Sequence, residues 1–429
     1  MMNKNCLFLI IIMILASQIS CSHDANLKDI IKLNYLLSDN SNDMYVPYKL
    51  DDSSLQETGL PVISIQTAEN AKILSKKNWV SAEMQIYNAK NSEWDFDGLD
   101  ISIRGRGNTT WELSKRPYAI KLSSQKNILG MPEHNRWVLI ANYWDNSFIK
   151  NAIAFYISRQ IGMDYTIRGE YVNFVLNGNY VGLYWLGEAI KIDTNRVDID
   201  DENDYLIEMD SHYDESWRFH SALKNLPYMI KNDEKMNAAK FTNLKDRISE
   251  MENILYSSSF PYTNADKNEF NIRYSEYIDL DSFAKFYIVN EIMHNGELQH
   301  PNSCFFTFTT DSGLLKAGPV WDFDWACYTT KTELILKNTL YFDSLFKLPE
   351  FNEKLSLFLS DSYITEEGVF EEVENLREEI SKAVVLDGER WGTNHRNQVG
   401  NVQTDFDAYV DDVKNCIISR LKFMKEEMF

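Results

Sequence analysis

Residues 295–325 read NGELQHPNSCFFTFTTDSGLLKAGPVWDFDW, and the fold prediction begins from this stretch. Two apolar runs, one containing Phe305–Phe308 and one ending at Val320, flank the turn sequence Asp311-Ser312-Gly313. Because Asp, Ser and Gly accept the backbone conformations of tight turns, the stretch predicts a β-hairpin. Acidic and amide side chains stand at both mouths of this hairpin: Glu297, Asn302, Asp322 and Asp324. Side chains in such positions can converge on a ligand.

The same stretch combines an acid, an amide five residues later and an Asp-Phe dipeptide that follows the hairpin. Protein kinases place their catalytic loop and metal-binding aspartate in this order. Magnesium takes oxygen ligands in proteins, and Asn302, Asp322 and Asp324 form a donor set of that kind. The seven histidines show no HExxH spacing and no GxSxG motif occurs, so the sequence favours neither a zinc hydrolase nor a serine hydrolase.

The composition is that of a large folded protein with an acidic surface. With 429 residues the chain exceeds one ordinary core, which predicts one two-lobed domain or two domains. The 23 Tyr, 23 Phe and 10 Trp residues provide ample material for a packed interior. The formal charge of −21 argues against a nucleic-acid partner, because phosphate binding depends mainly on cationic side chains. This overall charge is compatible with a local basic cleft that binds a nucleotide.

The N-terminus has the form of a secretory signal. Residues 1–20 contain one lysine, an apolar run of about ten residues and then small and polar residues before Cys21. The run is short for a transmembrane helix. A cysteine directly after the apolar segment is typical of lipoprotein signals, and we therefore predict a bacterial extracytoplasmic protein, lipid-anchored at Cys21 in the cell envelope. A plain signal peptide and an uncleaved anchor are the alternatives.

Residues 21–58 are rich in Asn, Asp and Ser and predict a tether. Of the cysteines beyond it, Cys304, Cys327 and Cys416, no two have CxxC spacing. They indicate buried thiols rather than a zinc site, while a pair between Cys304 and Cys327 stays open.

Hydrophobic periodicity divides the chain into a sheet-rich and a helix-rich half. Alternating apolar residues predict strands at 60–65, 79–87, 99–104 and 118–122, and a hairpin over 171–186 that turns at Asn177-Gly178. Helical spacing predicts helices at 148–160, 238–256, 281–295, 365–383 and 405–428. We therefore predict an α+β fold with a sheet-rich part over 59–187 and a helix-rich part over 188–429. Trp217, Phe219 and Tyr228 form either a surface platform or part of the core.

A basic, glycine-containing loop lies within the sheet-rich part. It reads RGRGNTTW from Arg104, and KRPYAIKL follows from Lys115. Glycine lets the backbone approach an anion closely and Arg can bind phosphate with two hydrogen bonds, so the loop could hold phosphates. A tight basic turn between strands is the alternative. Lys121 lies on the polar face of a strand, where it is either solvated or in contact with a nucleotide.

Four blocks of the sequence, in this order, resemble the CotH (spore coat protein H) kinase family. They are RGRGNTTW with KRPYAIKL over 104–122, LGMPEHNRWVLIANYWDNSFIKNAIAFYIS over 129–158, NFVLNGNYVGLYWLGEAIKI over 173–192 and GPVWDFDWA over 318–326. The resemblance extends from about Leu60 to Leu421. It implies a secreted, atypical protein-kinase-like fold with a sheet-rich N-lobe and a helix-rich C-lobe. It also implies the use of ATP and Mg²⁺, or Mn²⁺, to phosphorylate Ser or Thr of extracytoplasmic proteins.

The resemblance also assigns roles to individual residues. Lys121 is similar to the strand lysine that meets the nucleotide phosphates, with Arg104 or Arg106 assisting. Glu188 lies where the family has its interlobe hinge, so the backbone there is expected to meet the adenine. The expected metal ligands are Asn302, Asp322 and Asp324.

One residue departs from the family pattern. The catalytic-loop acid is usually aspartate in an Asn-X-Asp sequence, whereas Asn295-Gly296-Glu297 supplies glutamate. The extra methylene displaces the carboxylate, and positioning is most of phosphoryl-transfer catalysis. Three functions follow as hypotheses: an active kinase with Glu297 as proton acceptor, a weakened pseudokinase that serves as a surface binding or adhesion lipoprotein, and a nucleotidyltransferase that transfers AMP.

Overall fold

The computed structural model describes residues 46–328, 332–392 and 405–428, and their strands and helices form the α+β fold that the sequence predicts. The predicted signal peptide over 1–20, the lipidation site at Cys21 and most of the predicted tether lie outside the described residues. Within the described ranges, no helix is both long enough and apolar enough to cross a bilayer.

Seven strands form a closed barrel in the order β1-β2-β3-β4-β5-β7-β6. All neighbours in the barrel are antiparallel except β1 and β6, which are parallel. The strands are β1 Val62–Thr67, β2 Val80–Tyr87, β3 Phe96–Gly105, β4 Tyr118–Ile128, β5 Met131–Ile140, β6 Gly169–Leu176 and β7 Asn179–Glu188. Their alternation fills the interior: Ile120 pairs with Ile103 and Trp137, and all three side chains are buried. The predicted turn at Asn177-Gly178 is confirmed, since both residues have the positive φ of a two-residue hairpin loop.

A second sheet of five strands follows, in the order β14-β13-β8-β10-β9. Its strands are β8 Tyr205–Met209, β9 Arg218–His220, β10 Pro227–Ile230, β13 Cys304–Thr309 and β14 Leu314–Ala317. The hairpin predicted from residues 295–325 is confirmed as β13 and β14, and Gly313 has a φ of +70° in the turn between them. Phe219 and Tyr228 are buried and their rings stack, so they belong to the core and not to a surface platform.

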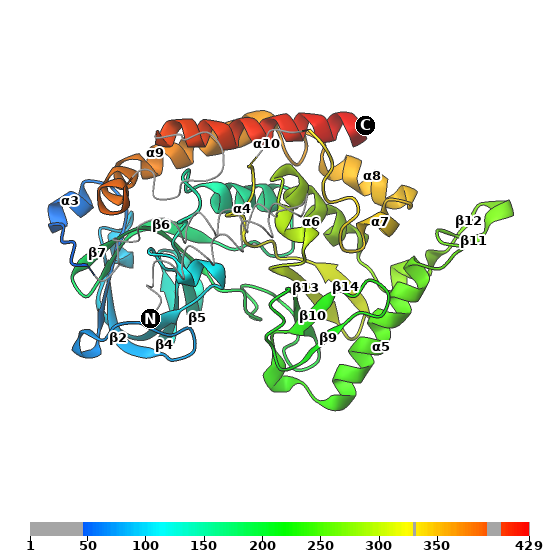
Figure 1. Ribbon diagram of the computed structural model, residues 1–429, viewed down its shortest axis with the longest axis horizontal. Coiled ribbons are helices and arrows are strands. Elements are labelled where there is room, and N and C mark those ends of the chain that lie inside the picture. The colour runs from blue at the N-terminus through cyan, green and yellow to red at the C-terminus, as the bar shows by residue number, and fades with distance from the viewer. Residues whose placement is uncertain (1–45, 329–331, 393–404, 429) are drawn as a thin grey trace, which may run out of the picture.

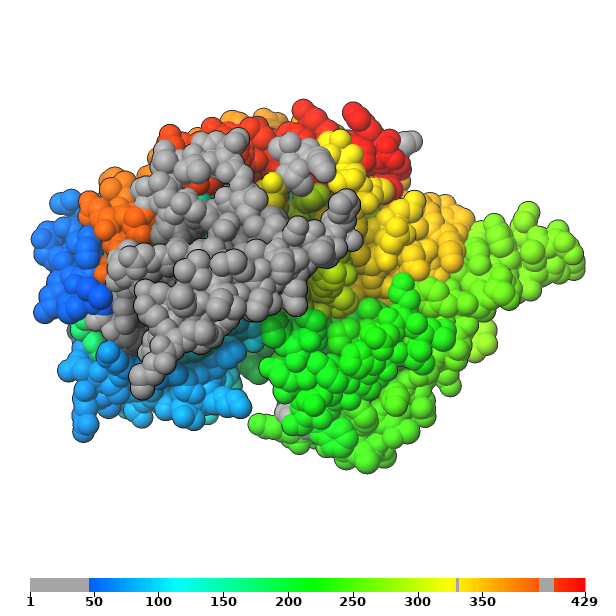
Figure 2. All heavy atoms as spheres, in the orientation of Figure 1, coloured from blue at the N-terminus to red at the C-terminus, as the bar shows by residue number. Residues whose placement is uncertain are grey.

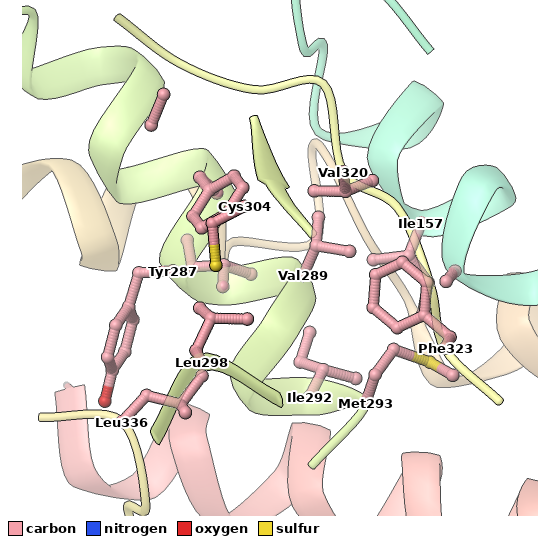
Figure 3. Packing of buried hydrophobic residues seen from close by; sticks show 14 of the residues in the cluster. Ile157, Tyr287, Val289, Ile292, Met293, Leu298, Cys304, Val320, Phe323 and Leu336 are labelled. Atoms are coloured by element: carbon pink, nitrogen blue, oxygen red, sulfur yellow. The ribbon is translucent and has the colours of Figure 1, made fainter. Parts of the chain in front are cut away.

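Helices surround and connect the two sheets. They are α3 Asp52–Gln56, α4 Lys150–Gln160, α5 Ala238–Leu255, α6 Leu280–Ile292, α7 Phe342–Leu345, α8 Pro349–Phe358, α9 Glu366–Trp391 and α10 Phe406–Met428. Helix α6 begins where the Asp279 carboxylate accepts a hydrogen bond from Ser282 N, and nearly all of its residues are buried. Figure 3 shows its side chains Val289 and Ile292 packed in the core among Leu298, Val320 and Met293.

Two long C-terminal helices run along one side of the molecule, over both the barrel and the helical half (Figure 1). Helix α10 is tied to α6 by a fully buried ion pair in which Arg420 Nη2 lies 2.5 Å from Glu291 Oε1. At the right-hand end of the view, the two-stranded ribbon of β11 Tyr262–Asn264 and β12 Glu269–Phe270 projects away from the body, beyond the end of α5 (Figure 1).

Three features differ from the sequence prediction. The packed part of the chain begins earlier than residue 59, because Leu55 is buried and Tyr48 O accepts a hydrogen bond of 2.8 Å from Tyr180 N. Helix α9 continues to Trp391 rather than ending at residue 383, and α7 and α8 were not predicted. Cys304, Cys327 and Cys416 are buried free thiols, as the sequence favoured, and Cys304 is not paired with Cys327.

Candidate active site

A cleft of about 670 Å³ lies between the barrel and the second sheet. Figure 2 shows an indentation at this place, between the blue barrel strands and the green segment that follows residue 200. Six of the site residues predicted from the sequence line this one cleft: Arg104, Arg106, Glu297, Asn302, Asp322 and Asp324. The fold therefore brings together side chains that are up to 220 residues apart in the sequence.

The barrel wall of the cleft is basic. Arg104 and Arg136 both lie over the ring of Trp79, with guanidinium carbons 4.8 and 5.1 Å from the ring centroid. The glycines of the predicted phosphate loop have a steric reason to be glycine: a Cβ at Gly105 would lie 2.2 Å from the Trp111 ring, and Gly107 has a φ of +81°. The Gly-x-Gly pattern is therefore explained by packing and by backbone conformation, and does not by itself indicate phosphate binding.

Arg106 is the barrel cation that faces the acids of the opposite wall. Its guanidinium carbon lies 5.2 Å from the centroid of the Trp321 ring. Burial lowers the pKa of Arg106, whereas the nearby carboxylates of Asp322, Asp324 and Glu208 favour its charged form. Since an arginine keeps its charge under such conditions, the cleft holds a fixed positive charge beside two of the predicted metal ligands.

The structure places Lys121 outside the lining of the cleft. Lys121 pairs with Ser102 and Arg136 in the barrel and its side chain is exposed. Ala119, two residues earlier on β4, does line the cleft, and Arg106 N bonds to Pro117 O beyond it. Arg106, just after β3, is therefore level with Pro117 of the neighbouring chain segment, whereas Lys121 lies beyond Ala119 in the other direction.

The structure also places Glu188 away from the cleft. Glu188 is the last residue of β7, and its fully buried carboxylate bonds to Tyr165 and Arg168. The next three residues, Ala189, Ile190 and Lys191, line the cleft instead.

The acidic wall begins with the loop between α6 and β13. Glu297 is 5% exposed, and its Oε2 accepts a hydrogen bond of 2.9 Å from Asn302 Nδ2. Asn302 Oδ1 in turn accepts a hydrogen bond of 3.3 Å from Ser211 N. Asn295 connects this loop to the second mouth of the hairpin, because its side chain accepts from Glu297 N and donates to Asp322 O. The two mouths therefore form one hydrogen-bonded unit.

Asp322 has a left-handed backbone conformation, with a φ of +66°. Non-glycine residues seldom adopt this conformation, and surrounding contacts must hold it. Ser303 Oγ donates a hydrogen bond of 3.1 Å to Asp322 Oδ2. Ser303 has a φ of +52°, so both residues of this contact have strained backbones that are characteristic of functional sites.

Asp324 is buried deeper than Asp322. Its Oδ1 accepts a hydrogen bond of 2.7 Å from Asn151 Nδ2. Desolvation, and then the neighbouring Asp145 carboxylate, raise the pKa of Asp324 to about 6. Two buried carboxylates next to each other repel, and a bound cation would relieve that repulsion.

The donor set fits a divalent cation that takes oxygen ligands. In the part of the chain that the structure describes, no group of three or more His, Cys, Asp and Glu side chains is placed to hold a metal ion alone. The candidate set of Asp322, Asp324 and the amide oxygen of Asn302 combines two carboxylates with a neutral oxygen. Mg²⁺ and Mn²⁺ accept such sets when substrate phosphates and water complete the coordination.

Sequence reasoning missed four residues of the site. Asp210 follows β8, and its carboxylate accepts hydrogen bonds from Ser303 N at 3.0 Å and His212 N at 2.8 Å. Lys115 lines the cleft and is fully buried, with its Nζ 2.5 Å from Asp387 Oδ1. His212 and Asn151 line the same cleft. Of these, Lys115 and Asn151 lie in motifs that the sequence singled out, KRPYAIKL and the block over 129–158, and no local pattern marks Asp210 and His212.

Comparison with known proteins identifies the family of the chain. A model of the CotH kinase protein family matches residues 103–424, which is most of the chain and includes every cleft residue named above from Arg104 onward. No curated protein matches the chain. On the strength of the family match, the chain belongs to the CotH kinase protein family.

Proposed function

We propose that this protein is an atypical protein kinase that transfers the γ-phosphate of ATP to a Ser or Thr hydroxyl of another protein. One observation carries the proposal: a single cleft brings the Arg106 guanidinium together with Asp322 and Asp324, beside the Glu297–Asn302 pair. A cation, a set of oxygen ligands and a candidate proton acceptor are the parts that phosphoryl transfer requires.

The proposal includes a two-lobed arrangement. The barrel is the N-lobe, which corresponds to residues 59–187 with the packed segment from Val46 added. The described parts of residues 188–429 form the C-lobe. The segment after Glu188 is the hinge in this view. We expect the adenine to lie against apolar lining residues next to it, which are Ala119, Val138, Ala189 and Ile190. Apolar walls of this kind are usual in small-molecule sites.

The residues of the cleft divide the chemistry among them. Arg106 would neutralise phosphate charge, with Arg104 as a second cation further along β3. Asn302, Asp322 and Asp324 would hold Mg²⁺ or Mn²⁺, which when bound neutralises the charge that develops on the transferred group. Glu297 would accept the proton of the attacking Ser or Thr hydroxyl. The hydroxyl oxygen would form a bond to the γ-phosphorus while the bond from that phosphorus to ADP breaks and ADP leaves.

Glu297 also supports a second candidate function. Its carboxylate is buried and already bonded to Asn302, so it is less accessible than an ideal proton acceptor. A protein with slow or lost transfer would serve as a pseudokinase that binds a partner at the surface. Transfer of AMP is a third function, and the mass added to the acceptor distinguishes it from transfer of a phosphoryl group.

We place the protein outside the cytoplasm, in a bacterial cell envelope, with a lipid on Cys21 as its membrane anchor. Its partners would be ATP and an extracytoplasmic protein substrate. The charge of −21 supports the absence of a nucleic-acid partner, because polyanions repel each other.

The test is incubation of the protein with γ-labelled ATP and Mg²⁺, then Mn²⁺, followed by mass spectrometry. Asp322→Ala serves as the control for the site. Label that depends on Asp322 supports the kinase. If no label appears but ATP with metal raises the melting temperature of the wild type and not of Asp322→Ala, the pseudokinase replaces it. If neither occurs, the cleft does not bind ATP.

A further inference from the structure

Asn151 joins helix α4 to the loop that carries both candidate metal aspartates. Its side chain is 3% exposed, and Oδ1 accepts a hydrogen bond of 3.0 Å from Phe323 N. The same amide donates from Nδ2 to Asp324 Oδ1 at 2.7 Å. A side-chain amide can do both because it combines an acceptor oxygen with a donor nitrogen. One side chain therefore holds the backbone between the two aspartates and the second carboxylate at once.

The ring of Phe323 is held by the same helix. Figure 3 shows Phe323 beside Ile157 of α4 and Met293 at the end of α6. The Phe155 ring of α4 makes an edge contact with Phe323, with centroids 6.4 Å apart. Phe323 is fully buried, so α4 anchors this residue by its backbone and by its side chain.

Asp322 needs such support on its C-terminal side. Its φ of +66° is strained, and two contacts that hold it come from the loop between α6 and β13, through Asn295 Nδ2 and Ser303 Oγ. Asn295 bonds to Asp322 O, the carbonyl of the peptide that follows Asp322, and Ser303 bonds to the carboxylate. Asn151 accepts from Phe323 N, the N–H of that same peptide, so the peptide is held at both of its polar groups.

We propose that Asn151 is a positioning residue for divalent-cation binding, which clamps residues 322–324 so that both aspartates present their carboxylates to one cation. This inference rests on the proposed function of the cleft. Partners that orient metal ligands are commonly worth a 10–100-fold change in metal affinity. Asn151 itself touches neither ATP nor the acceptor in this account.

The test uses Asn151→Leu, which keeps the approximate volume and removes both hydrogen bonds. Its control is Asn173→Leu, because Asn173 is an equally buried amide that bonds to Leu55 O and Thr58 Oγ1 on the far side of the barrel. Two quantities are measured: amide hydrogen exchange of the peptide that contains Phe323, and the dissociation constant for Mn²⁺ with ATP present, from the electron paramagnetic resonance signal of free Mn²⁺. We expect at least about tenfold weaker Mn²⁺ binding and faster exchange in Asn151→Leu alone.

The smaller variant Asn151→Ala gives a second test if Asn151→Leu folds poorly. It removes both hydrogen bonds without adding bulk or charge, so the Phe323 amide should exchange faster, and unchanged exchange would overturn the clamp. Unchanged exchange in Asn151→Leu overturns it as well, and faster exchange with unchanged Mn²⁺ affinity overturns the positioning role. If the wild type binds Mn²⁺ no better than Asp322→Ala, the proposed function fails together with the positioning role, while the exchange rates still report whether Asn151 holds the loop.

Discussion

Lys115 and Asp387 form a fully buried ion pair, with Nζ 2.5 Å from Oδ1, although 272 residues separate them in the sequence. Lys115 also donates to Leu183 O, and Asp387 accepts from Leu183 N, so the pair joins the barrel strand β7 to helix α9. Gly182 makes room for it, because a Cβ there would lie 2.5 Å from Asp387 Oδ1. The pair thereby connects the lining of the cleft to the C-terminal helices.

Removal of one partner of this pair should destabilise the protein strongly. Asp387→Asn leaves the Lys115 ammonium buried without its counter-charge, and we expect a loss of about 3–5 kcal/mol in the free energy of unfolding. Urea denaturation measures it. The control is Glu379→Gln, also on α9, which removes a partly exposed pair with Lys90 and should cost less than about 1 kcal/mol. Equal losses in the two variants would contradict the buried-pair account, and the double variant Lys115→Met/Asp387→Leu should recover much of the stability.

Replacement of Arg106 should weaken ATP binding more than replacement of Lys121. Arg106 faces Asp322 and Asp324 across the cleft, whereas Lys121 is exposed and outside its lining. A lost charge-assisted contact corresponds to roughly a 10–100-fold increase in KM for ATP in Arg106→Ala. Lys121→Ala should leave KM within about twofold of the wild type. Steady-state kinetics decides between them, and a large effect of Lys121→Ala would restore the assignment that the sequence favours.

Glu297→Gln keeps an oxygen that can accept from Asn302 but removes the proton acceptor. We expect kcat to fall by about 10²–10⁴-fold with little change in KM for ATP. Glu297→Asp should raise the rate, because it restores the aspartate of the family pattern. Both rates are measured on protein whose melting temperature is checked first. Unchanged label incorporation in both variants would mean that Glu297 has no catalytic role and would favour the pseudokinase.

His134 should make stability fall as the solution becomes acidic. Its Nδ1 accepts a hydrogen bond of 2.8 Å from Arg136 N, so the folded ring is neutral. Burial, and then the charge of Arg196, lower the pKa of His134 to about 4. The unfolded chain takes up a proton near pH 6.5, and the folded protein does so only near pH 4. The stability is therefore fully present above pH 6.5 and is lost as the pH falls toward 4, by an amount on the order of 2 kcal/mol.

The measurement is the free energy of unfolding from urea denaturation, at about pH 7.5 and about pH 4.5, near the two ends of this window. The wild type is compared with His134→Gln. The pH-dependent loss should be smaller in the variant, because it lacks the titrating ring. His220→Gln, at an exposed position, controls for the removal of one imidazole. An identical pH dependence in all three proteins would contradict the assignment to His134.

Local sequence patterns predicted the elements that short-range chemistry specifies. The Asn177-Gly178 and Asp311-Ser312-Gly313 turns formed as predicted, because their residues accept turn conformations wherever the chain places them. Helix α5 follows its predicted range within one residue, and α6 within a few, since capping side chains and apolar spacing act within one or two turns. Helix α9 was predicted too short, because its last turns are held by the distant partners Lys115 and Val181.

The sequence by itself determined the α+β class and the hairpin of β13 and β14, because periodicity and turn residues specify each within a few neighbouring residues. It also predicted six residues of one site, and the fold places these six in one cleft. Only the tertiary structure decided which cation faces the aspartates. Alternation along β4 predicts that Ala119 and Lys121 share a face, but it does not tell which end of that face borders the cleft. The sequence therefore could not decide whether Lys121 of β4 or Arg106, just after β3, faces the aspartates. The pairings of Lys115 with Asp387 and of Asn151 with Asp324 arise because the closed barrel and the long C-terminal helices bring distant segments into contact.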